Sequence, residues 1–176
     1  MKLTYLLIMA SLLDLGGLTG QSAGDLFPQL TTKDLTKKKV VFPDDLEGEV
    51  NILILVFQQR AQLLVNTWAD FILSDYEPQA NITYYEIPMM SSASGLISWQ
   101  VDNWMRAGIP AEYHDNTACF YGNRRPYFKA LEMNEIDSCY IFLVGKDGQI
   151  LWRENGKRTD EKEASFRKAV ERILSK

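Results

Sequence analysis

Three stretches of the chain have the hydrophobic pattern of central β-strands. Residues 50–57 are apolar at nearly every position, and residues 139–144 repeat this pattern, which is typical of strands covered on both faces of a sheet. Residues 82–87 are rich in β-branched and aromatic side chains, and we expect this strand to stop at Pro88. These three segments predict the centre of a buried sheet.

Turn signals predict two hairpins around these strands. Asp147 and Gly148 stand between the third strand and a further apolar stretch at residues 150–154, and Asp-Gly between two such runs is a strong hairpin signal. Residues 27–50 have short apolar pieces broken by prolines and acidic residues, which predicts a hairpin-like lead-in. A further short strand is expected within residues 113–122.

Apolar residues recur at spacings of three and four in the remaining segments, which predicts helices. The predicted helices cover residues 61–72, 94–107, 126–131 and 160–174. Pro78 ends the first of them, and Gly108 and Pro110 follow the second. Asp160 with Glu163 resembles the capping arrangement that begins a helix.

The order of these elements is strand, helix, strand, two helices, strand, hairpin strand and helix. A parallel βαβ start followed by an antiparallel hairpin and a last helix predicts a thioredoxin-like α/β fold, a three-layer sandwich with a central mixed sheet. The chain has 176 residues, of which 46% are hydrophobic, and this is enough for one well-filled core. We therefore predict a single domain over residues 25–176.

Residues 1–24 are predicted to be a secretory signal peptide. Lys2 precedes an apolar run at residues 3–13, and the small residues 22–24 are suited to cleavage. The run is shorter than the roughly 20 apolar residues that a membrane-spanning helix needs. The prediction is an exported protein, periplasmic or secreted. Anchoring to a membrane through an uncleaved N-terminal segment, or a buried N-terminal helix, stays open as the alternative.

The charge of the chain argues against a nucleic-acid partner. The net charge is −4 at pH 7, whereas a surface that neutralises phosphates needs a basic face or stripe. The run Lys37, Lys38 and Lys39 is interpreted as a solvated turn.

The junction after the first core strand lacks the chemistry that a thioredoxin-like enzyme uses. Disulfide exchange needs a thiolate of low pKa, usually at a helix N-terminus, with a second cysteine one turn further along. Residues 58–62 read QQRAQ and carry no sulfur. In redox members of the fold a cis proline precedes the third core strand, where this chain has Ser138 and Cys139. We therefore expect no catalytic residue at this junction.

Cys119 and Cys139 are the two cysteines of the chain. An oxidising compartment would permit a disulfide between them, although two cysteines do not make a disulfide framework. Three interpretations stay open from the sequence: two buried free thiols, a structural disulfide, and a redox pair.

His114 is the single histidine, and one histidine without a second strong ligand cannot build a zinc site. No nucleophile stands beside it in the sequence, and no glycine-rich phosphate loop is present. We expect a structural role for His114, no bound metal and no cofactor.

The predicted helix at residues 94–107 has two faces that could each bury apolar surface. An advance of about 100° per residue groups Ile97, Val101, Trp104 and Met105 on one face and Leu96, Trp99, Asn103 and Arg106 on the other. We expect the first face to pack on the sheet. Trp99 and Arg106 are then candidates for a partner-binding surface, because Trp and Arg are enriched at binding hot spots. Coverage by residues 113–125 is the alternative.

Several short motifs occur in an order and spacing that resemble a known family. They are Phe27, Pro28 and Leu30; Phe57, Ala61, Gln62 and Trp68; Ile109, Pro110, His114 and Asp115; residues 120–122, 129–131, 140–144 and 148–152. With these motifs the chain resembles the thioredoxin-like assembly factors of the mitochondrial ATP synthase membrane sector, the family called ATPase complex subunit ten. The resemblance implies a thioredoxin-like fold, no redox chemistry and a protein client.

These observations predict a non-catalytic, chaperone-like assembly or protein-binding factor. Its partner is expected to be a protein, in particular a membrane protein under assembly. The candidate partner surface comprises Trp99, Arg106, His114, Arg124 and Arg125. Two alternatives stay open: an atypical thiol-disulfide oxidoreductase that uses Cys119 and Cys139, and a small-molecule or peptide binder.

Overall fold

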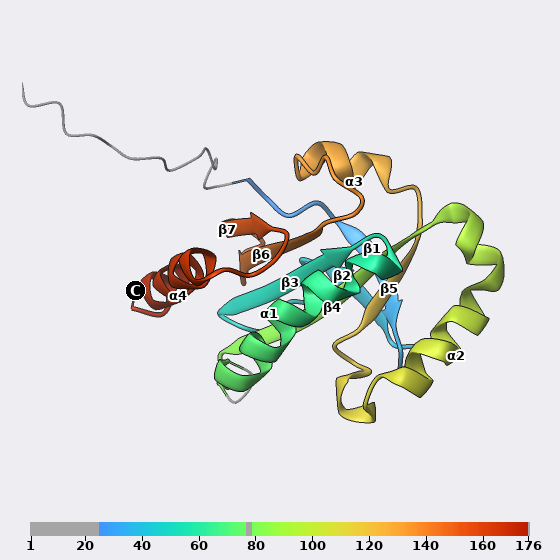
Figure 1. Cartoon of the computed structure of the whole chain (residues 1–176), viewed down its shortest axis with the longest axis horizontal. Helices are drawn as coiled ribbons and strands as arrows, with labels where there is room; N and C mark the ends of the chain where they lie inside the picture. Colours follow the sequence, from blue (N-terminus) through green and yellow to red (C-terminus); the bar gives the residue numbers. More distant parts are fainter. Residues whose placement is uncertain (1–24, 77–78, 176) are drawn as a thin grey trace, which may run out of the picture.

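The computed structural model describes residues 25–76 and 79–175, so the predicted leader lies outside the described residues. The described residues form a seven-stranded mixed sheet with flanking helices (Figure 1). The strands are β1 (Leu30–Asp34), β2 (Lys39–Phe42), β3 (Val50–Val56), β4 (Ile82–Ser91), β5 (Ala118–Gly122), β6 (Cys139–Gly145) and β7 (Ile150–Asn155). The helices are α1 (Gln62–Asp75), α2 (Ser98–Gly108), α3 (Arg125–Ala130) and α4 (Asp160–Leu174), with single turns of 3-10 helix at η1 (Gln59–Ala61) and η3 (Ala111–Tyr113) and a longer one at η2 (Ser92–Ile97).

The strand order is β2-β1-β5-β4-β3-β6-β7. The strand β3 lies at the centre of the predicted core. It pairs in parallel with β4 and antiparallel with β6, and all seven of its residues are buried. The β6–β7 hairpin is confirmed, with Gly148 in its turn at a φ of 80°. Glycine suits this position because the left-handed region is strained for other residues. The mixed sheet that the sequence predicts is therefore present.

The predicted lead-in is an antiparallel hairpin of β1 and β2. Leu30 pairs with Phe42, and Lys33 pairs with Lys39. This hairpin joins the sheet through β5, because Lys33 also pairs with Cys119. The predicted strand within residues 113–122 is thus β5, and it links the N-terminal hairpin to the central strands.

Two apolar cores lie on opposite faces of the sheet. One core packs α1 and α4 against the sheet, and its aromatic centre is Trp68, Phe166 and Trp152, whose side chains are almost fully buried. The other core lies under α3 and the lead-in, and it includes Phe27 and Leu131. Burial on both faces explains why the central strands are apolar at nearly every position.

The side chain of Asn51 is the exception in β3, because it is polar and fully buried. Its amide group donates to the backbone oxygens of Gly48 and Val144, at 2.8 and 3.1 Å, and its oxygen accepts from the backbone N–H of Gly48 at 3.0 Å. The hydroxyl of Thr83 donates to the same oxygen. The side chain of Asn51 therefore connects the turn before β3 to both neighbouring strands, β4 and β6, by hydrogen bonds.

The strand β4 runs through Pro88, so the expected end at this proline is wrong. Pro88 is the last β4 residue to pair with β3, and from Met89 onward β4 pairs with β5. The proline lies where the strand changes partner, and a missing N–H is tolerated at such an irregular position.

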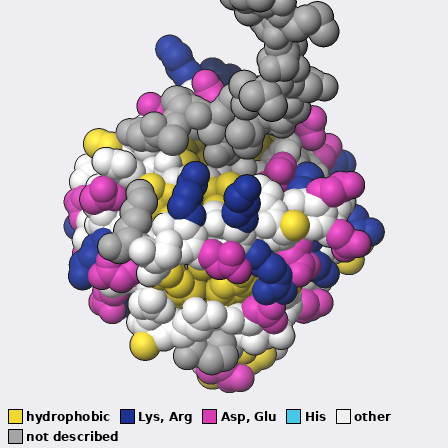
Figure 2. All heavy atoms as spheres, turned by 90° about the vertical axis from the view of Figure 1, so that its left-hand side faces the viewer, with side chains coloured by type: hydrophobic (Ala, Val, Ile, Leu, Met, Phe, Trp, Pro, Cys, Tyr) yellow, Lys and Arg dark blue, Asp and Glu magenta, His cyan; other side chains and the backbone are white. Residues whose placement is uncertain are grey.

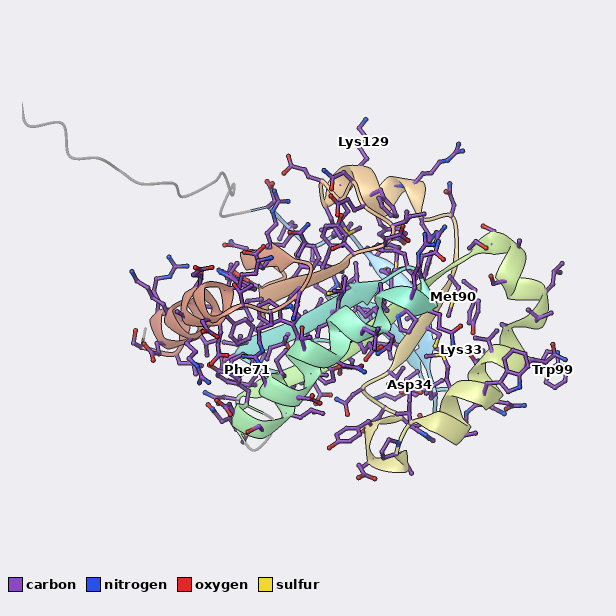
Figure 3. The ribbon with its side chains drawn as sticks, viewed as in Figure 1. Lys33, Asp34, Phe71, Met90, Trp99 and Lys129 are labelled. Carbon is purple, nitrogen blue, oxygen red and sulfur yellow. The ribbon has the colours of Figure 1, made fainter. Side chains whose placement is uncertain are left out.

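Helices α1 and α4 are joined at one end of the molecule by an arginine. The guanidinium of Arg167 lies 4.6 Å from the ring centroid of Phe71, which Figure 3 labels on α1. Arg167 also pairs with Asp75 at 2.6 Å and with Glu163 at 2.8 Å. These contacts close the apolar core against solvent at its edge.

Candidate functional site

The junction between β3 and α1 is the position where a thioredoxin-like enzyme would carry its reactive cysteine. Here the chain passes from extended backbone at Gln58 into the short turn η1 and then α1. Arg60 donates from its Nε atom to Asp137 at 2.6 Å, and both side chains are more than half exposed. The junction is thus closed by an exposed ion pair and contains no sulfur.

Beneath the first turn of α1 lies a half-buried carboxyl group. Glu86 of β4 accepts hydrogen bonds from Gln62 at 3.1 Å and from the Tyr84 hydroxyl at 3.3 Å. Burial raises the pKa of Glu86 above its usual range, although these two hydrogen bonds act in the opposite direction. The hydrogen bonds of the carboxyl group at this junction are therefore satisfied, and its cross-strand neighbour Thr117 donates its hydroxyl to the backbone oxygen of Tyr113.

The second half of a redox site is also replaced. The backbone before β6 holds Ser138, and Ser138 and Cys139 are both buried. Among the described residues the cis peptide bond is Phe42-Pro43, which lies at the end of β2 and away from this position.

Cys119 and Cys139 are both free and buried, and they lie on different strands. Between β5 and β6 stand the two strands β4 and β3. Three strand spacings of about 4.8 Å place the two backbones roughly 14 Å apart, whereas a disulfide needs Cα atoms within about 7 Å. At this separation the two cysteines are not bonded to each other in the structure.

Each thiol is held in its protonated form by its surroundings. Burial, with a smaller contribution from Asp102, raises the pKa of Cys119 to about 12, and burial raises the pKa of Cys139 to about 11. The Cys119 sulfur lies 3.4 Å from the sulfur of Met105 on α2. The Cys139 sulfur lies 3.4 Å from the backbone oxygen of Gly156.

These raised pKa values predict that alkaline solution destabilises the protein. Above pH 9 the unfolded chain loses two thiol protons that the folded protein retains, so the free energy of unfolding falls as pH rises from about 9 toward 11. We expect a loss on the order of 2 kcal/mol per thiol by pH 11, measured by urea unfolding across this range. The variant with Cys119→Ser and Cys139→Ser should show a shallower decline. An equal slope in the two proteins would contradict this assignment.

A groove lies between α2 and the β1–β2 hairpin, on the same face of the sheet as α1. Its volume is about 750 Å³, within the range of ligand-binding clefts. The lining residues are Thr31, Thr32, Lys33, Lys37, Lys39, Ser98, Trp99, Asp102, Asn103, Arg106, Cys119, Phe120 and Tyr121. Figure 3 labels Lys33 on the strand side and Trp99 on α2. The groove thus combines four cationic side chains with a single carboxylate.

Hydrogen bonds fix both the floor and one wall of this groove. The Tyr121 hydroxyl of β5 donates to Asp102 of α2 at 2.6 Å, and burial together with this carboxylate raises the pKa of Tyr121. On the wall, Arg106 donates from its Nε atom to the backbone oxygen of Leu35 at 2.6 Å and from Nη1 to Asn103 at 2.8 Å. The helix α2 is therefore tied to both β5 and the hairpin.

The sequence model of a family described as ATP10 protein matches residues 21–173, which is most of the chain. The chain belongs to the ATP10 protein family. This is a family of ATPase assembly factors, so the resemblance found in the sequence motifs is confirmed. No curated protein matches this family member.

Solved structures show the fold of this ATP10 family member. BsSco, of the Sco family of cytochrome c oxidase assembly proteins, has a TM-score of 0.61 at 15% identity, with 87% of this chain and 96% of that chain covered. A provisionally assigned thiol:disulfide interchange protein DsbE from Chlorobium tepidum has a TM-score of 0.58 at 18% identity, with 88% and 99% covered. At such identities the likeness shows the fold alone, and it confirms the predicted thioredoxin-like α/β class.

The five candidate partner residues of this ATP10 family member lie in different settings. Trp99 and Arg106 line the groove, and Trp99 is 63% exposed. A ring nitrogen of His114 lies 2.9 Å from the backbone oxygen of Ile109. Arg124 donates to the backbone oxygens of Phe57, just after β3, and of Met89 in β4. Arg125 begins α3 with an exposed side chain.

The predicted sheet-facing side of α2 is corrected in two positions. Trp104 is 70% exposed and Ile97 is 46% exposed, whereas Val101 and Met105 are half-buried as expected. The half-buried arc of α2 instead includes Arg106, whose exposure had been expected. Arg106 is half-buried because α2 lies beside the β1–β2 hairpin, where the Arg106 guanidinium donates to the backbone oxygen of Leu35.

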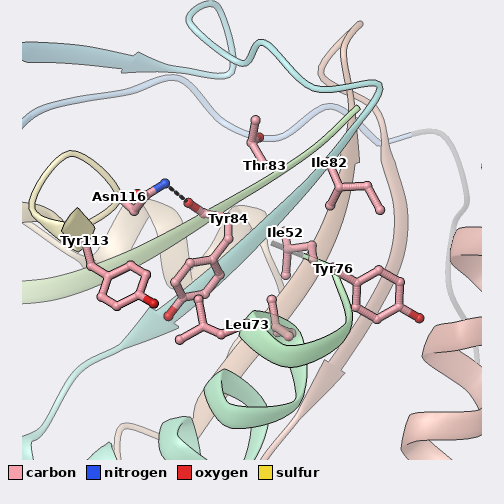
Figure 4. A pocket seen from close by; sticks show the side chains of 9 residues that line it. Ile52, Leu73, Tyr76, Ile82, Thr83, Tyr84, Tyr113 and Asn116 are labelled. Atoms are coloured by element: carbon pink, nitrogen blue, oxygen red, sulfur yellow. Dashed lines mark hydrogen bonds between the residues drawn. The ribbon is translucent and has the colours of Figure 1, made fainter. Parts of the chain in front are cut away.

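A second, smaller cavity of this ATP10 family member lies between the end of α1 and β4 (Figure 4). Tyr84 and Tyr113 stand side by side at it, and Asn116 donates to the backbone oxygen of Tyr84 at 2.8 Å. Its volume is about 130 Å³, below the roughly 300 Å³ at which ligand pockets begin. We interpret it as a packing gap between helix and sheet.

Two further features concern metals and membranes. Within residues 25–76 and 79–175, no group of three or more His, Cys, Asp or Glu side chains is arranged to hold a metal ion. None of the helices in this part of the chain has the length and hydropathy that crossing a bilayer requires.

Proposed function

We propose that this ATP10 family member is a non-catalytic assembly factor, exported, that binds a membrane protein of the ATP synthase while that protein is being assembled. The observation that carries the proposal is the junction between β3 and α1. Where a redox member of the fold needs a reactive cysteine, the chain places glutamines and an arginine, and Arg60 is paired with Asp137. The chain thus has the thioredoxin-like fold but lacks the reactive cysteine at this junction.

The two thiols elsewhere in the chain do not take the place of the reactive cysteine that the junction lacks. A thiol attacks a disulfide only as an accessible thiolate. Cys119 and Cys139 are buried, and their pKa values of about 12 and 11 keep them protonated at neutral pH. Their separation across two intervening strands also prevents one from resolving a mixed disulfide on the other.

Binding to a protein client is supported by the surface of α2. Trp99 and Trp104 are both largely exposed, and Leu96 and Ile97 before them are exposed as well. Apolar and aromatic side chains that gather on one surface element are typical of protein-binding sites. The predicted leader at residues 1–24 supports export, which would bring this surface to a client at the membrane.

The test uses cells that lack their own copy of this gene and that depend on ATP synthase. We expect wild-type protein and the variant with Cys119→Ser and Cys139→Ser to restore equal amounts of assembled ATP synthase on native gels. Neither protein should reduce insulin, with thioredoxin as the positive control. A folded double variant that fails to restore assembly would overturn the non-catalytic assignment. Normal ATP synthase in cells without the gene would overturn the choice of client.

A further inference from the structure

Two lysines of the β1–β2 hairpin are directed to the face of the sheet that α2 covers. Lys33 and Lys39 are directly opposite each other in the ladder, and Lys33 is also opposite Cys119. Residues that pair across strands point to the same face. The Cys119 side chain contacts Met105 of α2, so both lysines share this face. Lys37, in the turn between the strands, lines the same groove.

These lysine positions are unfavourable for the folded protein by itself. Like charges directly opposite on neighbouring strands repel each other. Lys37 has a φ of 75°, in the left-handed region that glycine and asparagine tolerate better. Within residues 25–76 and 79–175, none of the three lysines forms an ion pair. A bound anionic group would compensate for this repulsion.

The opposite wall of the groove supplies an aromatic side chain and a fourth cation. Trp99 is 63% exposed, and Arg106 is held against the hairpin by its hydrogen bond to Leu35. Seven helical positions separate these two residues, which is about 10 Å of helix. An extended peptide covers that length in about three residues. The single carboxylate, Asp102, already accepts a hydrogen bond from Tyr121.

We propose that an extended, acidic segment of a partner protein binds in this groove. Alternate acidic side chains of the segment face Lys33 and Lys39, and an apolar side chain between them packs on Trp99. The inference rests on the proposed function, because it names the surface through which the assembly factor holds its client. Two carboxylates spaced two residues apart match two cations on neighbouring strands, since side chains alternate along an extended chain.

The shape of the groove favours a peptide over a lipid bilayer. Its cations line a hollow of about 750 Å³, whereas a bilayer surface contacts flat or convex parts of a protein. The excess of cations is confined to the groove, because the whole chain has a net charge of −4. By comparison, basic and acidic side chains are intermixed at the end of the molecule where α4 lies (Figure 2).

The binding test uses the peptide fluorescein-Gly-Glu-Leu-Glu-Leu-Glu-amide, labelled at its N-terminus, which is titrated with the protein and followed by fluorescence anisotropy. We expect saturable binding that weakens as salt screens the charges. The variant with Lys33→Glu and Lys39→Glu should bind at least tenfold more weakly, and Trp99→Ala should weaken binding as well. The matched control carries Lys129→Glu and Lys168→Glu, the same change of charge at exposed sites on α3 and α4, and should bind within twofold of wild type.

The single variant Lys33→Glu separates a binding role from a structural one. It replaces the repelling lysine pair with a Glu-Lys pair, so we expect a higher unfolding temperature together with weaker peptide binding. Saturable binding that is equal in wild type and Lys33→Glu would overturn the proposal. Absence of binding at millimolar protein would overturn it too.

Two further measurements distinguish the remaining outcomes. Wild-type protein that sediments with phosphatidylglycerol vesicles through Lys33 and Lys39, but does not bind the peptide, would assign the groove to anionic lipid instead. In the assembly assay, a folded variant with Lys33→Glu and Lys39→Glu should fail to restore ATP synthase. Full restoration by this variant would overturn the groove as the client site and leave the proposed function intact, because that function is tested separately by the cysteine variant.

Discussion

Replacing Trp68 with alanine is expected to lower the free energy of unfolding by about 4 kcal/mol, because it removes a large, fully buried side chain from the core between α1 and α4. The Trp68 ring contacts Trp152 and Phe166, with centroids 6.2 and 6.0 Å away. Its Nε1 atom donates to the backbone oxygen of Gly156 at 2.9 Å, and that acceptor would keep only its weaker contact with the Cys139 thiol. Urea unfolding followed by circular dichroism measures the change.

The matched control for this variant is Trp104→Ala. The Trp104 side chain is 70% exposed on α2, and surface substitutions of this kind usually change stability by less than about 0.5 kcal/mol. A third variant, Trp68→Phe, keeps most of the apolar volume and should recover part of the loss. Equal destabilisation by the changes at Trp68 and Trp104 would contradict the placement of these two side chains.

Replacing Asn51 with leucine is expected to lower the free energy of unfolding by about 3 kcal/mol. Leucine has a similar volume but makes no hydrogen bonds, so buried partners in Gly48, Thr83 and Val144 would be left without the bonds that Asn51 now forms. Each unsatisfied buried polar group costs about 1–3 kcal/mol. Because Gly48 and Val144 are buried, water does not replace the bonds that their backbone groups lose.

Asn66→Leu is the control for the change at Asn51. Asn66 is exposed on α1 and makes one side-chain contact, a hydrogen bond from Gln62 at 3.3 Å. We expect its replacement to change the free energy of unfolding by less than about 0.5 kcal/mol. Thermal unfolding of both variants in the same buffer gives the comparison, and a stable Asn51→Leu protein would show that the hydrogen bonds around this residue contribute little.

The central part of the fold is predictable from the sequence because buried positions hold apolar residues, and the pattern of these residues is visible in the sequence. The strands β3 and β6 are buried on both faces, so they read as apolar runs, and the α4 stripe that includes Phe166 and Val170 has the spacing of a helix face. The Asp147-Gly148 pair between two apolar runs predicts the β6–β7 hairpin from local sequence alone. Such features depend on neighbours in sequence, and local patterns therefore reveal them.

The groove could not be predicted, because it depends on pairing between distant segments. Nothing in the sequence near Lys33 indicates that it lies between Lys39 and Cys119 in one row of the sheet. The charge of the lysine run at residues 37–39 is visible in the sequence and predicts a solvated turn, whereas the position of the run opposite α2 is not visible there. The exposure of Trp104 is not predictable either, because the spacing of apolar residues along a helix does not show how much of the helix the sheet covers.

The first described residues of the chain have a consequence for proteolytic processing. Backbone hydrogen bonds join Asp25 to Ile150 and Phe27 to Gly148, so this segment is already held beside the β6–β7 turn in the folded protein. Proteases bind their substrates in extended form on both sides of the cleaved bond. We therefore propose that removal of the predicted leader near residue 24 would compete with closure of this edge of the sheet, so that cleavage would be faster before folding than after it.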